Sequence, residues 1–478
     1  MSNVLYAGVD ELHRPSGNLG VRDEEAAWGA FRKDYARLLH APSFRRLQGK
    51  TQLFPGGESD FFRNRLTHSL EVAQIARGIA SSLNAGAVPS AFGRAAMIDE
   101  SLVEFAGIAH DLGHPPFGHN GEHALDELML DQGGFEGNAQ TLRILAAVEG
   151  KLVQKEKNVV AADWGLDLTY RSLASVLKYD SRIPMERSPR SKLAKGYYCS
   201  EADLVSEIKR RVAPRLGAGS AFKTIECAIM DIADDISYST YDLEDSLHAG
   251  FYSPLSLFNE IANNDDVCFE VITKTNQALA YNGYPLIEGK FEIFDVLNET
   301  FGLVHSPKRP EGRDEIPSKY LMMFDAVDLH CRDSDLTKNG LLRSRFTAER
   351  VGRLINAVEL VVNEEFPQLS GVRLGRGELL QVEVLKHLNF EVVIRSPRLS
   401  VVEHRGKDIV KGIFSAVMNS RGELLPEDWR RIYAAADSAG KGGVRRVVCD
   451  FIACMTDRYA FELYGRLFGE DSTIFKPF

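Results

Sequence analysis

The sequence predicts an all-α protein, and two observations support this expectation. Apolar residues recur at helical spacing in several long segments, whereas runs typical of β-strands are sparse. The chain has 478 residues, of which 44% are apolar and 26% charged, an ordinary composition for a soluble globular protein. A chain of this length can bury a large core, so it needs neither disulfides nor a structural metal for stability.

The clearest helical segments follow one another along the chain. Residues 70–83 place Val72, Ile75 and Ile79 on one face, and residues 101–109 form an apolar helical run. Further helices are expected at residues 224–241, 351–366 and 444–468. The best β-prone run is 390–395, so we expect little β structure beyond one small hairpin.

Irregular stretches interrupt these helices at residues 151–167, 182–195, 214–220 and 307–317. Their composition is typical of surface insertions rather than of linkers between domains. We therefore expect a large helical body over residues 1–310, with its functional core at about 60–250. A mostly helical C-terminal region, residues 311–478, is expected to pack on that body.

Charge, cysteine spacing and hydropathy exclude several classes of protein. Lys plus Arg is 57 and Asp plus Glu is 67, and a formal net charge of -10 argues against a protein that coats nucleic acid. The six cysteines form no C-x-x-C pair, so neither a zinc ribbon nor a disulfide framework is indicated. No stretch approaches the ~18 apolar residues of a membrane span, and no signal peptide is evident. A cytoplasmic protein without membrane contact is the expectation.

The densest group of chemically able residues is the segment 110–123, which reads HDLGHPPFGHNGEH and holds four of the twelve histidines. His110 and Asp111 end an apolar helical run, and Gly113 and the two prolines stop the helix there. Adjacent side chains can reach one metal ion at such a place, because the backbone leaves the regular helix.

Two further metal ligands are indicated elsewhere in the chain. His68 begins one predicted helix, and Asp234 lies inside the apolar helix 224–241. A carboxylate in an apolar helix should be paired or bound to metal, since burying it alone is costly. Two imidazoles and two carboxylates suit Mn²⁺, Fe²⁺ or Co²⁺ better than Mg²⁺. Singly, His68 is explained as a cap and Asp234 as a surface acid, so the hypothesis depends on the joint pattern.

The residues His68, His110, Asp111 and Asp234 resemble the metal signature of the HD-domain phosphohydrolases. Longer matches resemble a narrower group, the bacterial deoxyguanosine triphosphate triphosphohydrolases. These matches lie at residues 43–48, 50–55, 65–68, 110–119, 134–140, 234–238 and 455–459. They keep their order over most of the chain, and the combination of HDLGHPPFGH, GFEGNAQ and DDISY is highly specific.

The resemblance implies an all-α HD-domain body and a defined reaction. Water attacks the α-phosphorus of a deoxynucleoside triphosphate, here dGTP, and releases deoxyguanosine and tripolyphosphate. Mn²⁺ or Mg²⁺ is the implied cofactor, held by the four residues of the signature. The resemblance also implies that His119 acts at the scissile bond and that Glu122 orients it. These two residues share a face if a helix begins near Asn120, although Glu122 could instead be a first-turn acid favoured by the helix dipole.

Further positions match substrate contacts of the family. Arg65 lies about one helical turn before His68 and could reach a phosphate, and Lys178-Tyr179 resembles the family's Lys-Tyr pair near the phosphates and sugar. For His114, a structural or phosphate-side role is as readily expected as a catalytic one. Tyr238 and Asp242 follow Asp234 at helical spacing, where they would exclude a 2′-hydroxyl and hold the 3′-hydroxyl. Tyr238 as a core residue and Asp242 as a solvated acid are the alternatives. Gln52 matches a sugar-side position and Asn138 a pocket position.

Three other functions remain open at this point. The segment 119–123 matches the H-x-x-E-H pattern of zinc peptidases, which requires a helix through all five residues. An HD scaffold that senses nucleotides or binds single-stranded nucleic acid without turnover is a second alternative, disfavoured by the intact ligand set. A broad dNTP hydrolase, or a phosphohydrolase of other nucleotides, is the third, because the irregular stretches 151–167 and 182–195 depart from the family pattern and leave base preference undecided.

The resemblance also carries expectations about partners. Such enzymes are commonly homo-oligomers, often hexamers, and single-stranded DNA or a dNTP can act as effector. The basic pairs Arg430-Arg431 and Arg445-Arg446 are candidates for contact with a neighbouring subunit or a nucleic-acid activator. Solvated surface positions are the simpler explanation of such pairs.

Overall fold

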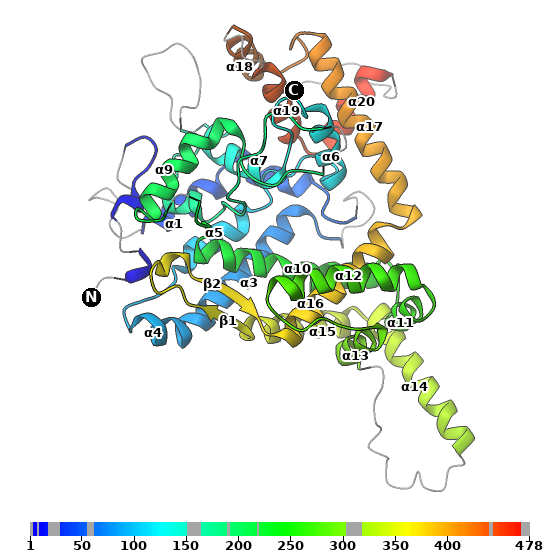
Figure 1. The fold of residues 1–478 in the computed structure, drawn as a ribbon. Helices are drawn as coiled ribbons and strands as arrows, with labels where there is room; N and C mark the ends of the chain where they lie inside the picture. Colours follow the sequence, from blue (N-terminus) through cyan, green and yellow to red (C-terminus); the bar gives the residue numbers. More distant parts are fainter. Residues whose placement is uncertain are drawn as a thin grey trace. The chain divides into compact units, whose positions relative to one another are not determined.

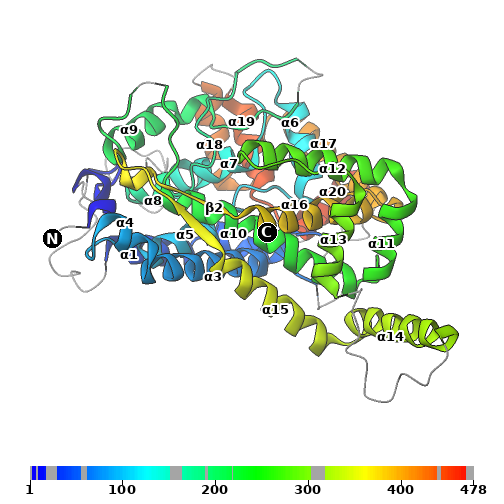
Figure 2. The ribbon, with the colours of Figure 1, turned by 60° about the horizontal axis from the view of Figure 1, so that its bottom comes forward.

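The computed structural model describes residues 3–6, 9–17, 29–54, 62–150, 164–188, 192–217, 219–302, 318–438 and 443–469. Helices dominate these residues (Figure 1), which confirms the predicted all-α class. The strands β1 (Val358–Val361) and β2 (Gly371–Leu374) lie side by side in a two-stranded sheet (Figure 2).

The chain forms two compact units. The first comprises Met1–Asp234, Leu360–Arg373 and Val401–Phe478, and the second comprises Asp235–Glu359 and Leu374–Ser400. Each unit thus draws on segments from both sides of residue 310. The predicted boundary at 310 falls within residues 303–317, outside the described residues, and it remains a prediction, as do the insertions at 151–163 and 307–317.

The helices of the first unit, including the first turns of α10 and most of α17, are α1 (Ala30–Leu39), α2 (Pro42–Arg46), α3 (Arg65–Ala85), α4 (Ala87–Phe92), α5 (Glu100–Ala109), α6 (Gly118–Leu128), α7 (Gly137–Arg143), α8 (Tyr170–Ala174), α9 (Ala202–Val212), α10 (Ile225–His248), α17 (Pro397–Asn419), α18 (Glu427–Ser438), α19 (Gly443–Ala453) and α20 (Asp457–Phe468). One apolar cluster of this unit includes Leu102 and Phe105 of α5 with Leu38 of α1. A second joins Leu125 of α6 to Ile413 of α17 and Ile452 of α19. The C-terminal helices therefore share a core with the helix that carries His119.

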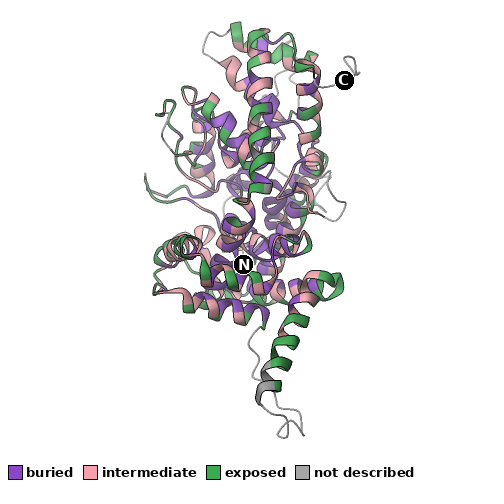
Figure 3. Cartoon of the chain, turned by 90° about the vertical axis from the view of Figure 1, so that its right-hand side faces the viewer, coloured by how far each residue is buried: buried purple, intermediate pink, exposed green. Residues whose placement is uncertain are grey.

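The second unit contains the remainder of α10 with α11 (Pro254–Asn263), α12 (Asp265–Tyr281), α13 (Lys290–Phe301), α14 (Ser318–Lys338), α15 (Gly340–Asn356) and α16 (Arg376–Asn389). Figure 3 shows that α14 is mostly exposed, in contrast to the buried interiors of the packed helices.

Three predicted helices are confirmed, and three other local predictions need correction. Helices α3 and α5 cover the predicted segments 70–83 and 101–109, and α10 covers all but the first residue of the predicted segment 224–241. The prediction of a strand at residues 390–395 is wrong. This segment continues α16 as a π-helical turn, Phe390–Ile394, in which Val393 is fully buried. Tertiary packing of this kind routinely outweighs β-propensity.

The other two corrections concern where helices end. The helix predicted over 351–366 ends at Asn356, because Val358–Val361 pairs with a strand ten or more residues further on, a partner that local spacing does not reveal. The single helix predicted over 444–468 is two helices, since Thr456 caps α20 by accepting a hydrogen bond from the Tyr459 amide.

Candidate active site

A close approach of two helices brings His68 and His110 together. Gly107 of α5 lies against α3 so tightly that a Cβ there would be 2.5 Å from Ala73 Cα. Asn64 caps α3 by accepting from the Thr67 amide, which fixes the first turn that carries His68. His110 follows α5 as its C-cap, and the two imidazole centroids are 5.4 Å apart.

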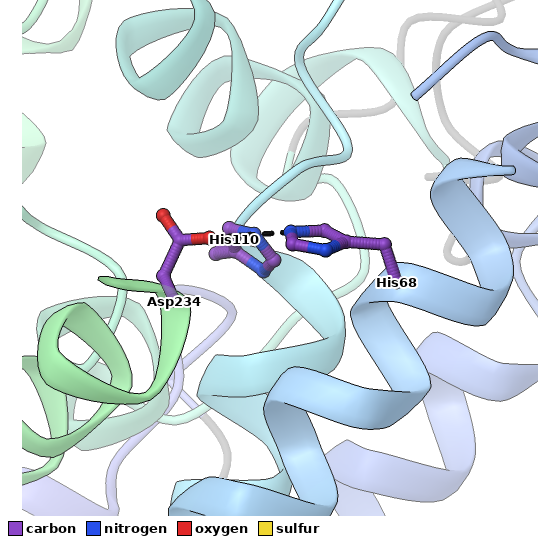
Figure 4. A group of neighbouring side chains, drawn as sticks. All are labelled: His68, His110 and Asp234. Atoms are coloured by element: carbon purple, nitrogen blue, oxygen red, sulfur yellow. Dashed lines mark hydrogen bonds and ion pairs between the residues drawn. The ribbon is translucent and has the colours of Figure 1, made fainter. Parts of the chain in front are cut away.

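Asp234 of α10 completes this group. Its Oδ1 lies 3.2 Å from His68 Nε2 and 3.5 Å from His110 Nε2. Figure 4 shows the carboxylate and the two rings pointing toward one another. One ligand atom from each residue lies within 4.8 Å of the others, and all three residues are buried. The spacing and the donor types fit a divalent metal ion.

The orientation of His110 supports the same interpretation. Its Nδ1 lies 2.6 Å from the Gly107 carbonyl oxygen, which only accepts, so Nδ1 carries a proton and Nε2 is the atom that faces the carboxylates. This buried Nε2 makes no hydrogen bond within the described residues. Burial disfavours the charged ring, yet Asp111 and Asp234 raise the pKa of His110 to about 9. A positive charge is therefore favoured at this place, as a metal site requires.

Asp111 lies beside the group but contacts other partners. Its Oδ2 is 2.6 Å from an Arg65 guanidinium nitrogen, and its Oδ1 is 2.9 Å from His114 Nδ1 and 3.5 Å from His110 Nε2. Burial alone would raise the pKa of Asp111, but His114, Arg65 and His110 hold it well below its usual range. The structure thus brings three of the four predicted ligands together and leaves Asp111 as their neighbour, paired with Arg65.

His119 and Glu122 form a second close pair of predicted site residues. Helix α6 begins at Gly118, so both residues lie in its first two turns, and His119 Nδ1 is 3.0 Å from Glu122 Oε2. The other carboxylate oxygen accepts from the Gly137 amide at 2.8 Å. The Glu122 side chain is 7% exposed and that of His119 is 65% exposed. A buried carboxylate that accepts two hydrogen bonds therefore fixes the His119 imidazole, whose Nε2 is left for other contacts.

The charge of Glu122 follows from these contacts. Burial alone would raise its pKa, but the hydrogen bond from His119, the charges of His119 and His114, and the Gly137 amide lower it to about 2. Glu122 is thus an anion at neutral pH, which is the state that can orient and stabilise an imidazolium.

The segment 134–140 is packed directly on the His110–His114 turn. A Cβ at Gly113 would lie 2.0 Å from the Gly137 carbonyl oxygen, so only glycine fits there. Thr141 Oγ1 accepts from the Gly113 amide and donates to the His110 carbonyl, each at 3.0 Å. The start of α7 therefore holds both Glu122, through the Gly137 amide, and the turn that carries His110.

Lys178 is the predicted phosphate contact that lies nearest to the ligand group. Its Nζ is 2.5 Å from Asp231 Oδ1 and 3.8 Å from Asp234 Oδ2. Burial works against its charge, but Asp231 and Asp234 raise the pKa of Lys178 well above its ordinary value. Asp231 also pairs with Lys223 at 2.5 Å. Asp231 was not predicted as a site residue, although its position one helical turn before Asp234 indicates that both carboxylates lie on the same face of α10.

The remaining predicted substrate contacts do not form one group with each other. Gln52 is half-buried, and its Oε1 has no hydrogen-bond partner among the described residues. Asn138 donates to Glu136 Oε1 at 2.7 Å, and Tyr179 accepts from Lys195 Nζ at 3.0 Å. Tyr238 and Asp242 follow Asp234 by one and two turns of α10, in the part that belongs to the second unit. Their roles remain predictions.

Known proteins resemble this chain over most of its length. The HD domain family matches residues 65–239, and the phosphohydrolase-associated domain family matches residues 372–466. The chain is 43% identical to a Mesorhizobium japonicum protein named deoxyguanosinetriphosphate triphosphohydrolase-like protein 2, with 94% of both chains covered. Proteins of Aliivibrio fischeri and Shewanella baltica named deoxyguanosinetriphosphate triphosphohydrolase-like protein are 32% and 30% identical, with 92% of both chains covered.

The chain belongs to the deoxyguanosinetriphosphate triphosphohydrolase-like family. It is thus an HD-domain phosphohydrolase, and the His68, His110 and Asp234 group is its candidate metal centre. Among the described residues, no helix is both long and apolar enough to span a membrane.

Membership of this family disfavours the zinc-peptidase alternative, and so does the geometry. Helix α6 does run through residues 119–123, as that alternative requires. However, His123 is exposed and belongs to neither group of possible metal ligands in the described part of the chain, where His119 groups with His114 and Glu122 instead.

The basic pairs have partners within the chain. Arg446 donates to the carbonyls of Gln132 and Gly134 and stacks on the Tyr198 ring, while Arg445 pairs with Asp131. Arg431 pairs with Glu427. These contacts favour an ordinary structural role for the pairs over the predicted contact with an activator.

Proposed function

We propose that this protein is a metal-dependent deoxynucleoside triphosphate triphosphohydrolase that converts dGTP and water to deoxyguanosine and tripolyphosphate. One observation carries the proposal. A buried two-histidine, one-carboxylate group lies in the same unit as an exposed histidine that a buried carboxylate orients. Hydrolysis at the α-phosphorus needs both parts: a Lewis acid near the phosphate and a proton donor for the departing oxygen.

His68, His110 and Asp234 would hold the ion, with Asp111 as the fourth ligand. The bound ion supplies Lewis-acid chemistry, activating water and neutralising negative charge on the phosphate. Mn²⁺ and Mg²⁺ are the proposed cofactors, and the nitrogen donors also suit Fe²⁺ or Co²⁺. Asp111 would contribute Oδ1, which lies 3.5 Å from His110 Nε2, while its Oδ2 pairs with Arg65.

His119 is the proposed acid for the leaving group. Protonated at Nε2, it gives that proton to the 5′-oxygen as the bond from this oxygen to the α-phosphorus breaks, so deoxyguanosine leaves as a neutral alcohol. Glu122 stabilises the imidazolium beforehand by accepting from Nδ1, and the Gly137 amide holds Glu122 in place. This division of work follows from exposure, because His119 is open to a substrate and Glu122 is not.

The substrate contacts are proposed from position and charge. Lys178, 3.8 Å from Asp234, and Arg65, which pairs with Asp111, would neutralise the triphosphate, and His114 and Tyr179 are the further proposed contacts. On α10, Tyr238 is proposed to exclude a 2′-hydroxyl and Asp242 to accept from the 3′-hydroxyl. Gln52 and Asn138 are proposed as sugar-side and pocket contacts.

Product analysis tests this function. The purified protein is incubated with Mn²⁺ and each of the four dNTPs separately, and with GTP, and the products are separated by anion exchange. Deoxyguanosine and tripolyphosphate from dGTP, absent with His110→Ala, are expected. Comparable turnover of all four dNTPs would replace the dGTP preference with a broad specificity. Nucleoside diphosphate or monophosphate would overturn attack at the α-phosphorus.

We also propose that the protein is cytoplasmic. It is further proposed to be a homo-oligomer, with a hexamer as the form that the resemblance to the family implies. Light scattering on the eluting protein measures this directly, and a monomer at micromolar concentration would contradict it. Turnover that appears only with mixed dNTPs or single-stranded DNA would identify an effector.

A further inference from the structure

A carboxylate from the C-terminal region reaches into the turn that precedes α6. Asp457, the first residue of α20, accepts through Oδ1 from the Phe117 amide at 2.9 Å. Its Oδ2 accepts from the Thr51 amide at 2.8 Å and from the Thr51 hydroxyl at 2.5 Å. One side chain therefore joins the residue before Gln52 to the residue two positions before His119.

The backbone at Phe117 needs such support. Phe117 has a φ of 63° and Gly118 a φ of 57°, so two successive residues are left-handed where α6 begins. A non-glycine residue in this region persists only when surrounding contacts hold it. The Phe117 ring meets α17 at Gly406, where a Cβ would lie 2.8 Å from Phe117 Cβ. Both contacts that hold Phe117 thus come from the C-terminal part of the first unit.

A second brace acts on the same turn. Lys50 is buried, and its Nζ donates to the His114 carbonyl at 2.6 Å and to the Ala453 carbonyl at 2.8 Å. Lys50 and Thr51 are adjacent, and Ala453 and Asp457 flank the break between α19 and α20. The turn 114–117 is therefore tied at both ends to the same corner of the C-terminal region.

We propose that Asp457 is a positioning residue for catalysis: it fixes the left-handed turn at Phe117 and thereby the direction in which α6 presents His119. The inference rests on the proposed function for the role of His119. On this proposal, the phosphohydrolase-associated region, residues 372–466, contributes to catalysis without contacting the substrate itself.

The chain offers a matched control at Asp34. There Oδ2 accepts from the Thr169 amide and the Thr169 hydroxyl, each at 2.8 Å, which is the pattern that Asp457 makes with Thr51. Asp34 pairs with Arg14 and touches no residue of the proposed site. Asp34→Asn and Asp457→Asn each replace a carboxylate that accepts from a threonine amide and hydroxyl, but only the second acts on the turn before α6. Asparagine has one acceptor oxygen, so at position 457 it can no longer accept from both the Phe117 amide and the Thr51 amide.

The test measures kcat, KM, the melting temperature and backbone hydrogen exchange of residues 114–121 in the intact protein. Asp457→Asn is expected to lower kcat by about tenfold to 100-fold with little change in KM, since a misdirected acid slows chemistry more than binding. Exchange in residues 114–121 is expected to become faster. Asp34→Asn should lower the melting temperature at least as much, because it also breaks the buried ion pair with Arg14, and should leave kcat and that exchange as in the wild type. Thr51→Val, with Thr169→Val as its control, removes one of the donors that hold Asp457 and gives a milder form of the comparison if Asp457→Asn does not fold.

Two outcomes would overturn the proposal. Loss of kcat in proportion to loss of stability in both aspartate variants would make Asp457 a merely structural residue, and unchanged exchange at residues 114–121 would exclude it as the support of the turn. Exchange needs no turnover. If the wild type hydrolyses no dNTP, the proposed function fails while the exchange result still decides whether Asp457 holds the turn.

Discussion

His119 and Glu122 carry the sharpest expectation for single residues. His119→Ala is expected to lower kcat by about 100-fold or more, because a general acid contributes that much to the departure of a poor leaving group. Metal affinity should stay as in the wild type, since His119 is not among the proposed ligands. Steady-state kinetics and a metal titration check both points, and a variant that keeps its kcat would remove His119 from the mechanism.

Glu136 predicts a pH dependence of stability. Burial raises its pKa to about 7, against the hydrogen bonds from Asn138 and Ala139 and with a further rise from the Glu122 charge. The folded protein therefore binds more protons than the unfolded chain between about pH 4.5 and 7, so this residue makes the free energy of unfolding fall as the pH rises through that window. The full effect is about 3 kcal/mol.

Glu136→Gln isolates that contribution. The variant should show a flatter dependence of the unfolding free energy on pH between 5 and 8 than the wild type, measured by denaturant unfolding at several pH values. Parallel curves for the two proteins would mean that Glu136 ionises normally in the folded state.

The candidate metal ligands show how far single residues can be interpreted from a sequence. The proximity of His68, His110 and Asp234 could be expected because these residues are chemically unusual where they stand, two at the ends of apolar helical runs and one inside. Asp111 was predicted as an equal member, but local spacing does not show that Arg65, one turn before His68, pairs with it at 2.6 Å. Asp457 and Asp231 were missed for the same reason, since their partners lie far along the chain or face inward.

The packing of α3 on α5 sets the geometry of the candidate metal centre, and Gly107→Ala tests it. A Cβ at Gly107 would lie 2.5 Å from Ala73 Cα, so the two helices must move apart and separate His68 from His110. We expect a loss of about 1–3 kcal/mol in unfolding free energy and weaker metal binding. Gly352→Ala in α15 is the matched control: its Cβ meets nothing within 4 Å, so it should stabilise the protein by about 0.5–1 kcal/mol. Equal metal affinity in both variants would show that the packing of α3 on α5 does not determine metal binding.

Helices with a strong apolar period were predicted correctly, while helix ends and strand pairing were not. The run 390–395 has the composition of a strand, yet it follows α16 without a break and buries Val393. Segment 358–361 was read as the continuation of a helix, and its pairing with Gly371–Leu374 depends on a contact outside any local window. Periodicity reports which face is buried and says little about what lies against it.

The N-terminal and C-terminal parts of the chain are joined by buried charge as well as by apolar packing. Arg143 of α7 contacts Asp450 of α19 at 2.8 Å and Glu201 at 2.8 Å, and Gln140 donates to Asp450 at 2.9 Å. Burial opposes the charge of Arg143, but Asp450 and Glu201 raise its pKa above the ordinary value. Since α7 also supplies Gly137 to Glu122, this link ties the C-terminal helices to the site a second time.

Asp450→Asn tests that link. The variant removes a charged acceptor from Arg143 but leaves Glu201 as its partner, so we expect a loss of about 1.5–3 kcal/mol in unfolding free energy. Glu299→Gln, which weakens an exposed pair with Arg353, should cost less than about 1 kcal/mol. Similar small losses in both variants, measured by denaturant unfolding, would show that the two parts of the chain do not depend on this contact.

The central claim is hydrolysis at the α-phosphorus, and isotope transfer from oxygen-18-labelled water measures it most directly. With dGTP and Mn²⁺, the label should appear in tripolyphosphate and not in deoxyguanosine, because water attacks phosphorus and the original 5′-oxygen leaves with the nucleoside. Label in the 5′-hydroxyl of deoxyguanosine, or in orthophosphate or pyrophosphate released first, would contradict the mechanism and the roles assigned to His119 and the metal group.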